Sequence, residues 1–163
     1  MSEKVICNAS PLIFLSKIGR LVLLSDLFSE ICVPTGAWEE AIRKPDDVSK
    51  DLKKMKSSNA INVFTVKNTT AVSAIVGRLH IGEVEVIIGA GEQGVSKVIL
   101  DDGYARSKAK QMGLSVTGTL GVLIAAQQKG LISDIDSDLD NLLKTGFRIS
   151  DSIVNQVRNM AKK

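Results

Sequence analysis

Side chains that bind the softer transition metals are scarce in this chain. Its 163 residues include two cysteines, Cys7 and Cys32, and one histidine, His80. The cysteines lie far apart inside short apolar segments, without the local spacing of a zinc site. We therefore expect two buried free thiols in a reducing compartment. An isolated histidine such as His80 is more typical of a structural role than of catalysis.

Aromatic residues and long apolar runs are also rare. Aromatic side chains make up 4% of the sequence, which leaves few platforms on which single-stranded bases could stack. The net charge of +3 is only mildly basic, so nucleic acid is allowed as a partner and its contacts would depend on phosphates. No run of about 18 apolar residues occurs and no signal-peptide pattern opens the chain. We expect a cytoplasmic protein that makes no contact with a membrane.

Short apolar segments alternate with helical patterns along the whole chain. The length suits one domain over residues 1–163 with a core of its own, because 44% of the residues are hydrophobic and 24% are charged. The alternation predicts an α/β fold in which helices cover both faces of a parallel sheet. Residues 150–163 are expected to form an amphipathic C-terminal helix with Ile153, Val154 and Val157 on its apolar face.

Two aspartates follow the most strand-like segment of the chain. Val98–Leu100 is an aliphatic run typical of a strand buried on both faces, and Asp101 and Asp102 come directly after it. Residues 104–112 have a helical pattern, so the unit is predicted to be strand, acidic turn and helix. In open α/β sheets, functional groups collect beyond the carboxyl ends of the strands. One of the two acids could instead serve only as the N-cap of the helix.

A second predicted strand, Val5–Cys7, also ends at a polar side chain, Asn8. Ser10 and Pro11 follow, and this pair suits the start of a helix, because serine can cap it and proline tolerates the first turn. Two strand ends of the predicted sheet therefore carry oxygen ligands.

Two glutamate pairs lie near the predicted starts of helices. Glu39 and Glu40 follow Val33–Pro34, and Glu83 and Glu85 lie in a later helical segment. Acids at these positions could serve only to stabilise their helices, because a negative charge near a helix N-terminus interacts favourably with the helix dipole. Because Glu83 and Glu85 are two residues apart, they cannot share a helix face, and either one could overhang the carboxyl edge of the sheet.

Two familiar motifs in the chain are misleading. Residues 89–94 have the glycine spacing of a dinucleotide-binding turn, but they end a predicted helix and precede a strand, which is the wrong context. Residues 134–140 alternate aspartate with other residues as in a calcium loop, but the glycine and glutamate that such a loop needs are missing. We expect these aspartates to begin a helix.

Polar residues at strand ends and in first helical turns are expected to converge at one edge of the sheet. They are Asn8, Glu40, Glu83, Asp101 and Asp102. Converging carboxylates repel one another unless a cation lies between them, and oxygen-only ligands suit Mg²⁺ or Mn²⁺. Such ions activate water and offset the charge of a phosphodiester under attack. The pattern therefore indicates a metal-dependent nuclease.

Short segments spread over the chain follow one another in a characteristic order. They are Asn8–Ile13, Val33–Pro34, Trp38–Glu40, Gly82–Glu85, Leu100–Asp102, Val116–Leu123 and Gly146–Ser150. Together they resemble the PIN-domain superfamily, and more narrowly its toxin-like, nucleic-acid-binding branch from bacteria and archaea. Each segment alone is a weak signal, whereas their order is specific.

The resemblance implies a three-layer sandwich with a central parallel sheet of four or five strands. It also implies a Mg²⁺- or Mn²⁺-dependent endoribonuclease, often the toxin of a toxin–antitoxin pair. The catalytic positions would be Asn8, Glu40, Glu83 and Asp102, all of them also metal ligands, with Asp101 as a further ligand. The expected partners are RNA, a small antitoxin protein and a second copy of the chain in a homodimer.

The sequence departs from the pattern of this superfamily in two places. Asn8 stands where most active members carry aspartate, and the last acid, expected within residues 117–119, is missing. Asparagine keeps an oxygen ligand but removes a negative charge, so we expect one ion rather than two. The hydroxyls of Ser10, Thr117 and Thr119 could bind phosphate. The alternative is a catalytically weakened or inactive PIN-fold module that binds RNA or protein.

Overall fold

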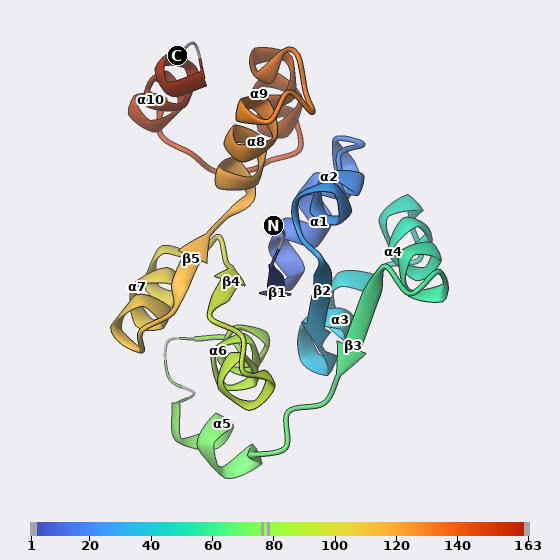
Figure 1. Cartoon of the computed structure of the whole chain (residues 1–163), viewed down its shortest axis with the longest axis vertical. Helices are drawn as coiled ribbons and strands as arrows, with labels where there is room; N and C mark the ends of the chain where they lie inside the picture. The colour runs from blue at the N-terminus through green and yellow to red at the C-terminus, as the bar shows by residue number, and fades with distance from the viewer. Residues whose placement is uncertain (1–2, 76, 78, 162–163) are drawn as a thin grey trace.

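A five-stranded parallel sheet forms the centre of the molecule (Figure 1). The structure is a computed structural model, and it describes residues 3–75, 77 and 79–161. The strands lie in the order β3-β2-β1-β4-β5. Their bounds are β1 Lys4–Cys7, β2 Glu30–Pro34, β3 Ile61–Phe64, β4 Lys97–Ile99 and β5 Ser115–Thr117. The predicted α/β sandwich is confirmed.

Helices cover both faces of this sheet. Their bounds are α1 Ala9–Lys17, α2 Val22–Leu27, α3 Thr35–Ile42, α4 Asp47–Ser57, α5 Thr69–Ile75, α6 Ile81–Gln93, α7 Gly103–Gln111, α8 Thr119–Gln128, α9 Ile135–Lys144 and α10 Asp151–Ala161. Residues of α1, α2, α3, α4, α8, α9 and α10 share one hydrophobic core, and those of α5, α6 and α7 share the other. In Figure 1, α5 and α6 lie below the sheet, α7 lies beside β5, and α8, α9 and α10 lie above the sheet.

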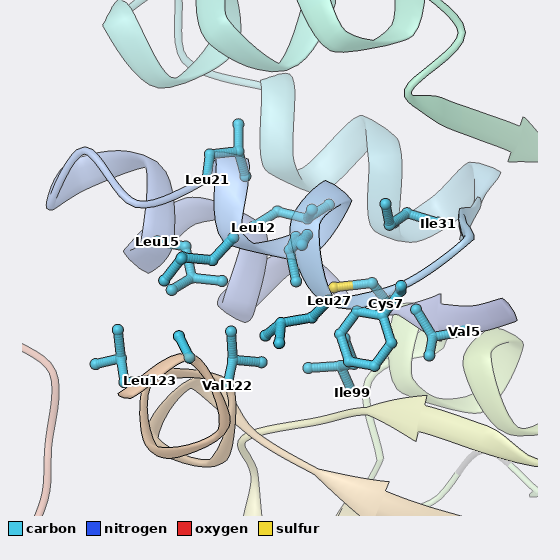
Figure 2. Packing of buried hydrophobic residues seen from close by; sticks show 14 of the residues in the cluster. Val5, Cys7, Leu12, Leu15, Leu21, Leu27, Ile31, Ile99, Val122 and Leu123 are labelled. Carbon is cyan, nitrogen blue, oxygen red and sulfur yellow. The ribbon is translucent and has the colours of Figure 1, made fainter. Parts of the chain in front are cut away.

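The side chains of β1 alternate between the two cores. Val5 and Cys7 point into the core of α1, α2 and α8, whereas Ile6 points into the core of α6 and α7. All three are fully buried. Because both faces are covered, the strand has no polar side, which explains its continuous apolar sequence. Figure 2 shows part of the first core, in which Leu15 of α1 lies close to Val122 and Leu123 of α8.

The order of the strands reverses between β1 and β4. The chain adds β2 and β3 on one side of β1 and then adds β4 and β5 on the other. Cys7 pairs with Ile99, and the backbone N–H of Asn8 donates to the carbonyl oxygen of Ile99 at 3.1 Å. Asn8 and the residues after β4 therefore leave the sheet at neighbouring strand ends. Such reversal points open the crevices in which α/β sheets bind ligands.

The two misleading motifs are helix ends, as expected. Residues 89–93 belong to α6, and Gly94 is its C-cap in the left-handed region, with a φ of 66°. Asp134 is the N-cap of α9 and accepts a hydrogen bond from the backbone N–H of Ser137 at 3.2 Å. Neither segment forms the ligand-binding loop that its spacing suggests.

The C-terminal helix is α10. The predicted span of 150–163 becomes 151–161, and residues 162 and 163 lie outside the described residues. Val154 and Val157 are buried, whereas Ile153, the third residue expected on the apolar face, is 44% exposed. Residues three apart share a helix face, whereas adjacent residues are turned away from each other.

Both cysteines are buried and free, as expected. Burial raises the pKa of the Cys7 thiol well above its ordinary value, and the nearby carboxylate of Asp101 acts in the same direction. This thiol therefore stays protonated and behaves as a small apolar side chain.

Within the described ranges, no helix is both long and apolar enough to cross a bilayer.

The packing of α1 on the sheet predicts the effect of a cavity. Leu12 is fully buried, so Leu12→Ala should lower the free energy of unfolding by about 2–5 kcal/mol. Val22 is 58% exposed, and Val22→Ala should change it by less than about 0.5 kcal/mol. Urea denaturation of the two variants measures both values. Similar losses for the two would contradict the assignment of Leu12 to the core.

Candidate metal and nuclease site

Asn8 presents a buried oxygen that has no hydrogen-bond partner. It follows β1, it is 6% exposed, and its side-chain Oδ1 finds no partner among the described residues. A Cβ added at Gly82 would lie 3.4 Å from this oxygen, so Oδ1 faces the first turn of α6. An orphaned buried acceptor is costly unless a donor or a cation satisfies it.

Glu83 brings a buried carboxylate to the same place. It lies in the first turn of α6 and is 6% exposed. One oxygen, Oε1, accepts a hydrogen bond from the backbone N–H of His80 at 3.0 Å. Burial raises the pKa of Glu83, the His80 hydrogen bond opposes this, and the carboxylates of Asp102 and Glu40 add to the increase. Three acids from α3, α6 and the β4–α7 turn therefore interact electrostatically.

Asp102 is the N-cap of α7. Its Oδ2 accepts a hydrogen bond from the backbone N–H of Ala105 at 2.9 Å. One of the two aspartates was expected to be an N-cap, and Asp102 is that residue. The side chain is exposed, and its second oxygen has no hydrogen bond among the described residues. Glu40 is also exposed, on α3, and belongs to no ion pair in the described part of the chain. Both carboxylates are available to solvent.

Asp101 is engaged by two neighbouring helices. The backbone N–H of Thr119 donates to its Oδ1 at 2.7 Å, and the Thr119 hydroxyl donates to its Oδ2 at 2.7 Å. The hydroxyl of Ser10 also donates to Oδ2, at 2.9 Å. Because hydrogen bonds to a charged acceptor are strong, these contacts of Asp101 hold the starts of α1 and α8 close to the end of β4.

These contacts correct one prediction about Ser10. Asn8, not Ser10, holds the N-cap position of α1, because the Ser10 hydroxyl donates to Asp101 instead of capping the helix. The hydroxyls of Ser10 and Thr119 are thus directed to a carboxylate in this structure. The Thr117 hydroxyl lies against Gly121, where an added Cβ would overlap it.

The structure separates Glu83 from Glu85. Glu85 Oε1 accepts a hydrogen bond from the backbone N–H of Gly36 at 2.8 Å, in the first turn of α3. A Cβ at position 36 would lie 2.7 Å from that oxygen, so only glycine allows this approach. Glu85 therefore stabilises the start of α3, and Glu83 faces the acids. Sequence spacing alone could not decide between them, because the decision depends on a distant glycine.

The donor set fits one hydrated cation better than two. No three His, Cys, Asp or Glu side chains of the described residues are close enough to form a metal site by themselves. Asn8 Oδ1 and the second oxygens of Glu83 and Asp102 add up to a mixed set of amide and carboxylate oxygens. Mg²⁺ commonly keeps several waters and binds through one or two carboxylates. The residues present fit such an ion.

A basic residue that no sequence pattern indicated lies beside the acids. Nη1 of Arg106, on α7, donates to the carbonyl oxygen of Leu100 at 3.1 Å. A Cβ at Gly118 would lie 2.6 Å from this nitrogen and 2.8 Å from Oδ1 of Asp101. The arginine therefore lies next to the acidic turn. Its position depends on the pairing of β4 with β5, which no local pattern reveals.

Comparison with known proteins gives a family and a fold. A family model described as a PIN domain, DUF3368, matches residues 4–163. A solved structure, a PilT N-terminus domain protein, SSO1118, from the archaeon Sulfolobus solfataricus P2, is similar with a TM-score of 0.52 at 19% identity. The alignment covers 76% of this chain and 92% of that one, and at this identity it supports the fold alone. No curated protein matches the chain.

The raised pKa of Glu83 predicts how stability depends on pH. The folded protein holds the Glu83 proton to higher pH than the unfolded chain does. Its contribution to stability is therefore full below the ordinary carboxyl pKa and is lost as the pH rises through the folded-state pKa. Glu83→Gln cannot ionise and keeps an oxygen for the His80 N–H. The variant should gain stability relative to the wild type as the pH rises from about 4 to about 8.

Urea denaturation in EDTA over this pH range measures the difference. Glu39→Gln removes an exposed carboxylate of α3 and serves as the control, for which the difference should stay flat. A flat difference for Glu83→Gln as well would show that Glu83 is not destabilised by burial.

Proposed function

The chain belongs to the PIN-domain family, and we propose that it is a ribonuclease that uses one Mg²⁺ or Mn²⁺ ion. The observation that carries the proposal is the orphaned oxygen of Asn8. It is buried at the end of β1, beside the point where the strand order reverses, and it faces the helix turn that carries Glu83. An acceptor without a donor, next to a buried carboxylate whose pKa is raised by burial and by two neighbouring acids, favours a cation.

Each residue of the site has a proposed role. Asn8, Glu83 and Asp102 would hold the ion. Glu40, which is exposed, would act as the general base that accepts a proton from the attacking water. The bound ion would supply Lewis-acid chemistry, lowering the pKa of water and offsetting charge on the phosphodiester. Asp101 already accepts three hydrogen bonds, so we place it outside the ion's shell, where it positions Ser10 and Thr119.

The pKa of Glu83 couples ion binding to pH. A metal ligand must lose its proton, and burial makes this carboxylate reluctant to do so. The ion therefore competes with a proton at Glu83, and activity should fall towards acidic pH. Deprotonation without the ion leaves a buried negative charge, so the ion should also stabilise the fold.

A second candidate function is a catalytically weakened or inactive module that binds RNA or protein. It is favoured by the amide of Asn8 in place of a carboxylate and by the lack of an acid within residues 117–119. Calorimetric titration with Mn²⁺ separates the two functions. Heat of binding with RNA cleavage supports the nuclease, whereas RNA binding without any heat from Mn²⁺ supports the module.

Two partners extend the proposal. The family resemblance favours the role of a toxin whose site, around Asn8 and Glu83, is covered by a small antitoxin protein. Co-purification of a small protein encoded beside this chain would test this role. We also propose a homodimer. The family resemblance is the ground for this, and light scattering measures the mass in solution.

The proposed roles predict a loss of activity at two acids. Glu40→Gln and Asp102→Asn should each lower Mn²⁺-dependent RNA cleavage about 100-fold or more. Asparagine is itself a good N-cap, so Asp102→Asn should keep α7 stable. Glu39→Gln changes the adjacent exposed carboxylate on α3 and should leave the rate unchanged. Cleavage that persists in EDTA, or that is equal in all variants, would indicate a contaminating nuclease and contradict the proposal.

The amide at position 8 gives a test that does not depend on activity. Asn8→Asp adds a buried charge near two acids, so in EDTA it should lower the Tm by about 4–8 °C. Mn²⁺ should then raise the Tm of this variant by more than that of the wild type, because a carboxylate binds the ion more tightly. Asn155→Asp, at an exposed position of α10, is the control. A Tm that Mn²⁺ leaves unchanged in every protein would exclude the ion site.

A further inference from the structure

Arg106 is held at the carboxyl end of β4 by the backbone. Its Nη1 donates to the carbonyl oxygen of Leu100, the residue directly before Asp101 and Asp102, at 3.1 Å. Arg106 lies in α7, one turn after the N-cap Asp102, and its side chain is half-buried. Because the acceptor is a neutral carbonyl oxygen, this bond fixes the guanidinium beside the acidic turn without cancelling its charge.

Gly118, directly after β5, leaves the space that this side chain occupies. A Cβ added at position 118 would lie 2.6 Å from Nη1 of Arg106, 2.8 Å from Oδ1 of Asp101 and 3.1 Å from the carbonyl oxygen of Leu100. The φ of Gly118 is −131°, which any residue can adopt, so the close approach alone requires glycine. The guanidinium and the Asp101 carboxylate therefore lie on either side of one small space at the end of β5.

The guanidinium keeps donors for a ligand. An arginine side chain has five N–H donors, and the bond to Leu100 uses one of them. No further hydrogen bond and no ion pair of Arg106 occurs among the described residues. The side chain lines a groove of about 410 Å³ together with Asp101, Thr117 and Gly118. A planar guanidinium with free donors matches two oxygens of a phosphate, to which it can donate parallel hydrogen bonds.

The proposed reaction needs a second positive charge besides the ion. As water attacks a phosphodiester, negative charge increases on the oxygens bonded to phosphorus, and fixed cations stabilise it. The oxygens of Asn8, Glu83 and Asp102 fit one cation, and residues 117–119, at the end of β5, include no carboxylate that could hold another. A fixed guanidinium on the β5 side would complement an ion on the β1 side.

The other cations near the acids are less suited to this role. Arg43 and Lys44 line a groove with Glu40, and Arg148 lines the groove of Arg106. All three are exposed, and their side chains make no hydrogen bond or ion pair within the described part of the chain. A cation that is already fixed needs no reorganisation when charge develops, and Arg106 is the half-buried, hydrogen-bonded member of the four.

We propose that Arg106 is a catalytic residue that binds oxygens of the attacked phosphodiester and takes the place of a second cation. The inference rests on the proposed function for the reaction itself. In that reaction the water oxygen bonds to phosphorus and its proton passes to Glu40. The bond from phosphorus to the leaving oxygen breaks, and this oxygen keeps the electron pair and takes up a proton from solvent. Arg106 stays charged throughout and supplies hydrogen bonds, not a proton.

Hydrolysis of bis(p-nitrophenyl) phosphate in saturating Mn²⁺ tests the catalytic role without a particular RNA sequence. R106A should lower kcat at least about 100-fold and change KM less than about threefold, because the charge develops after binding. Guanidinium ion at a non-denaturing concentration should raise the kcat of R106A at least about tenfold, and it should not raise that of the wild type. R148A, which removes the exposed arginine of the same groove, should keep the wild-type kcat.

NMR of the arginine side chains tests the contact independently of activity. In Glu40→Gln with Mg²⁺, titration with dimethyl phosphate should shift the Nε–H signal of Arg106 saturably and leave that of Arg148 in place. R106K identifies the signal by its loss. A saturable shift, in a protein whose wild type does not hydrolyse the ester, would support the contact and contradict the proposed ribonuclease. The two proposals can therefore fail separately.

Three results would overturn the role of Arg106. They are a wild-type kcat in R106A, an equal loss in R148A, and an Nε–H signal that dimethyl phosphate does not move. A loss in R106A that guanidinium does not restore would reduce the residue to a structural support of the β4 end. R106K keeps a donor for Leu100, so it should keep the wild-type Tm while its kcat falls at least about tenfold. This variant retains the test if R106A fails to fold.

Discussion

The carboxylate of Asp101 is the contact on which the arrangement of the site depends. It accepts hydrogen bonds from Ser10 at the start of α1 and from Thr119 at the start of α8, and so joins three segments that are distant in sequence. Hydrogen bonds to a charged acceptor contribute about 1.5–3 kcal/mol each. They hold the end of β4 beside the end of β1, which brings Asp102 towards Asn8.

The acids around this contact are arranged at a cost in stability. Glu83 is buried next to the carboxylates of Asp102 and Glu40, and its pKa is raised as a result. Asn8 adds an unsatisfied oxygen to the same crevice. A fold selected for stability alone would pair or remove such groups, and sites of this kind are typical of function. The amide in place of a carboxylate lowers the repulsion, which agrees with a weaker site for a single ion.

The fold could be predicted because the central strands β1, β2 and β4 are apolar runs that are largely buried on both faces, and the candidate acids were chosen because they lie near strand ends and helix starts. The sequence alone did not indicate which contacts each acid makes. Asp101 faces helix starts because β4 pairs with β5, and Glu85 faces α3 because residue 36 is a glycine. Ser10 was expected to cap α1, but a distant carboxylate is a better acceptor for its hydroxyl. Long-range contacts of this kind leave no local pattern.

The account depends on a single divalent cation at the reversal of the strand order. Anomalous scattering from a crystal of the protein soaked in Mn²⁺ locates such an ion directly. We predict one peak in contact with Asn8 Oδ1 and with carboxylate oxygens of Glu83 and Asp102, with water in the remaining positions of its shell. A crystal at saturating Mn²⁺ that shows no peak between these side chains, or a peak held only by other residues, would contradict the account.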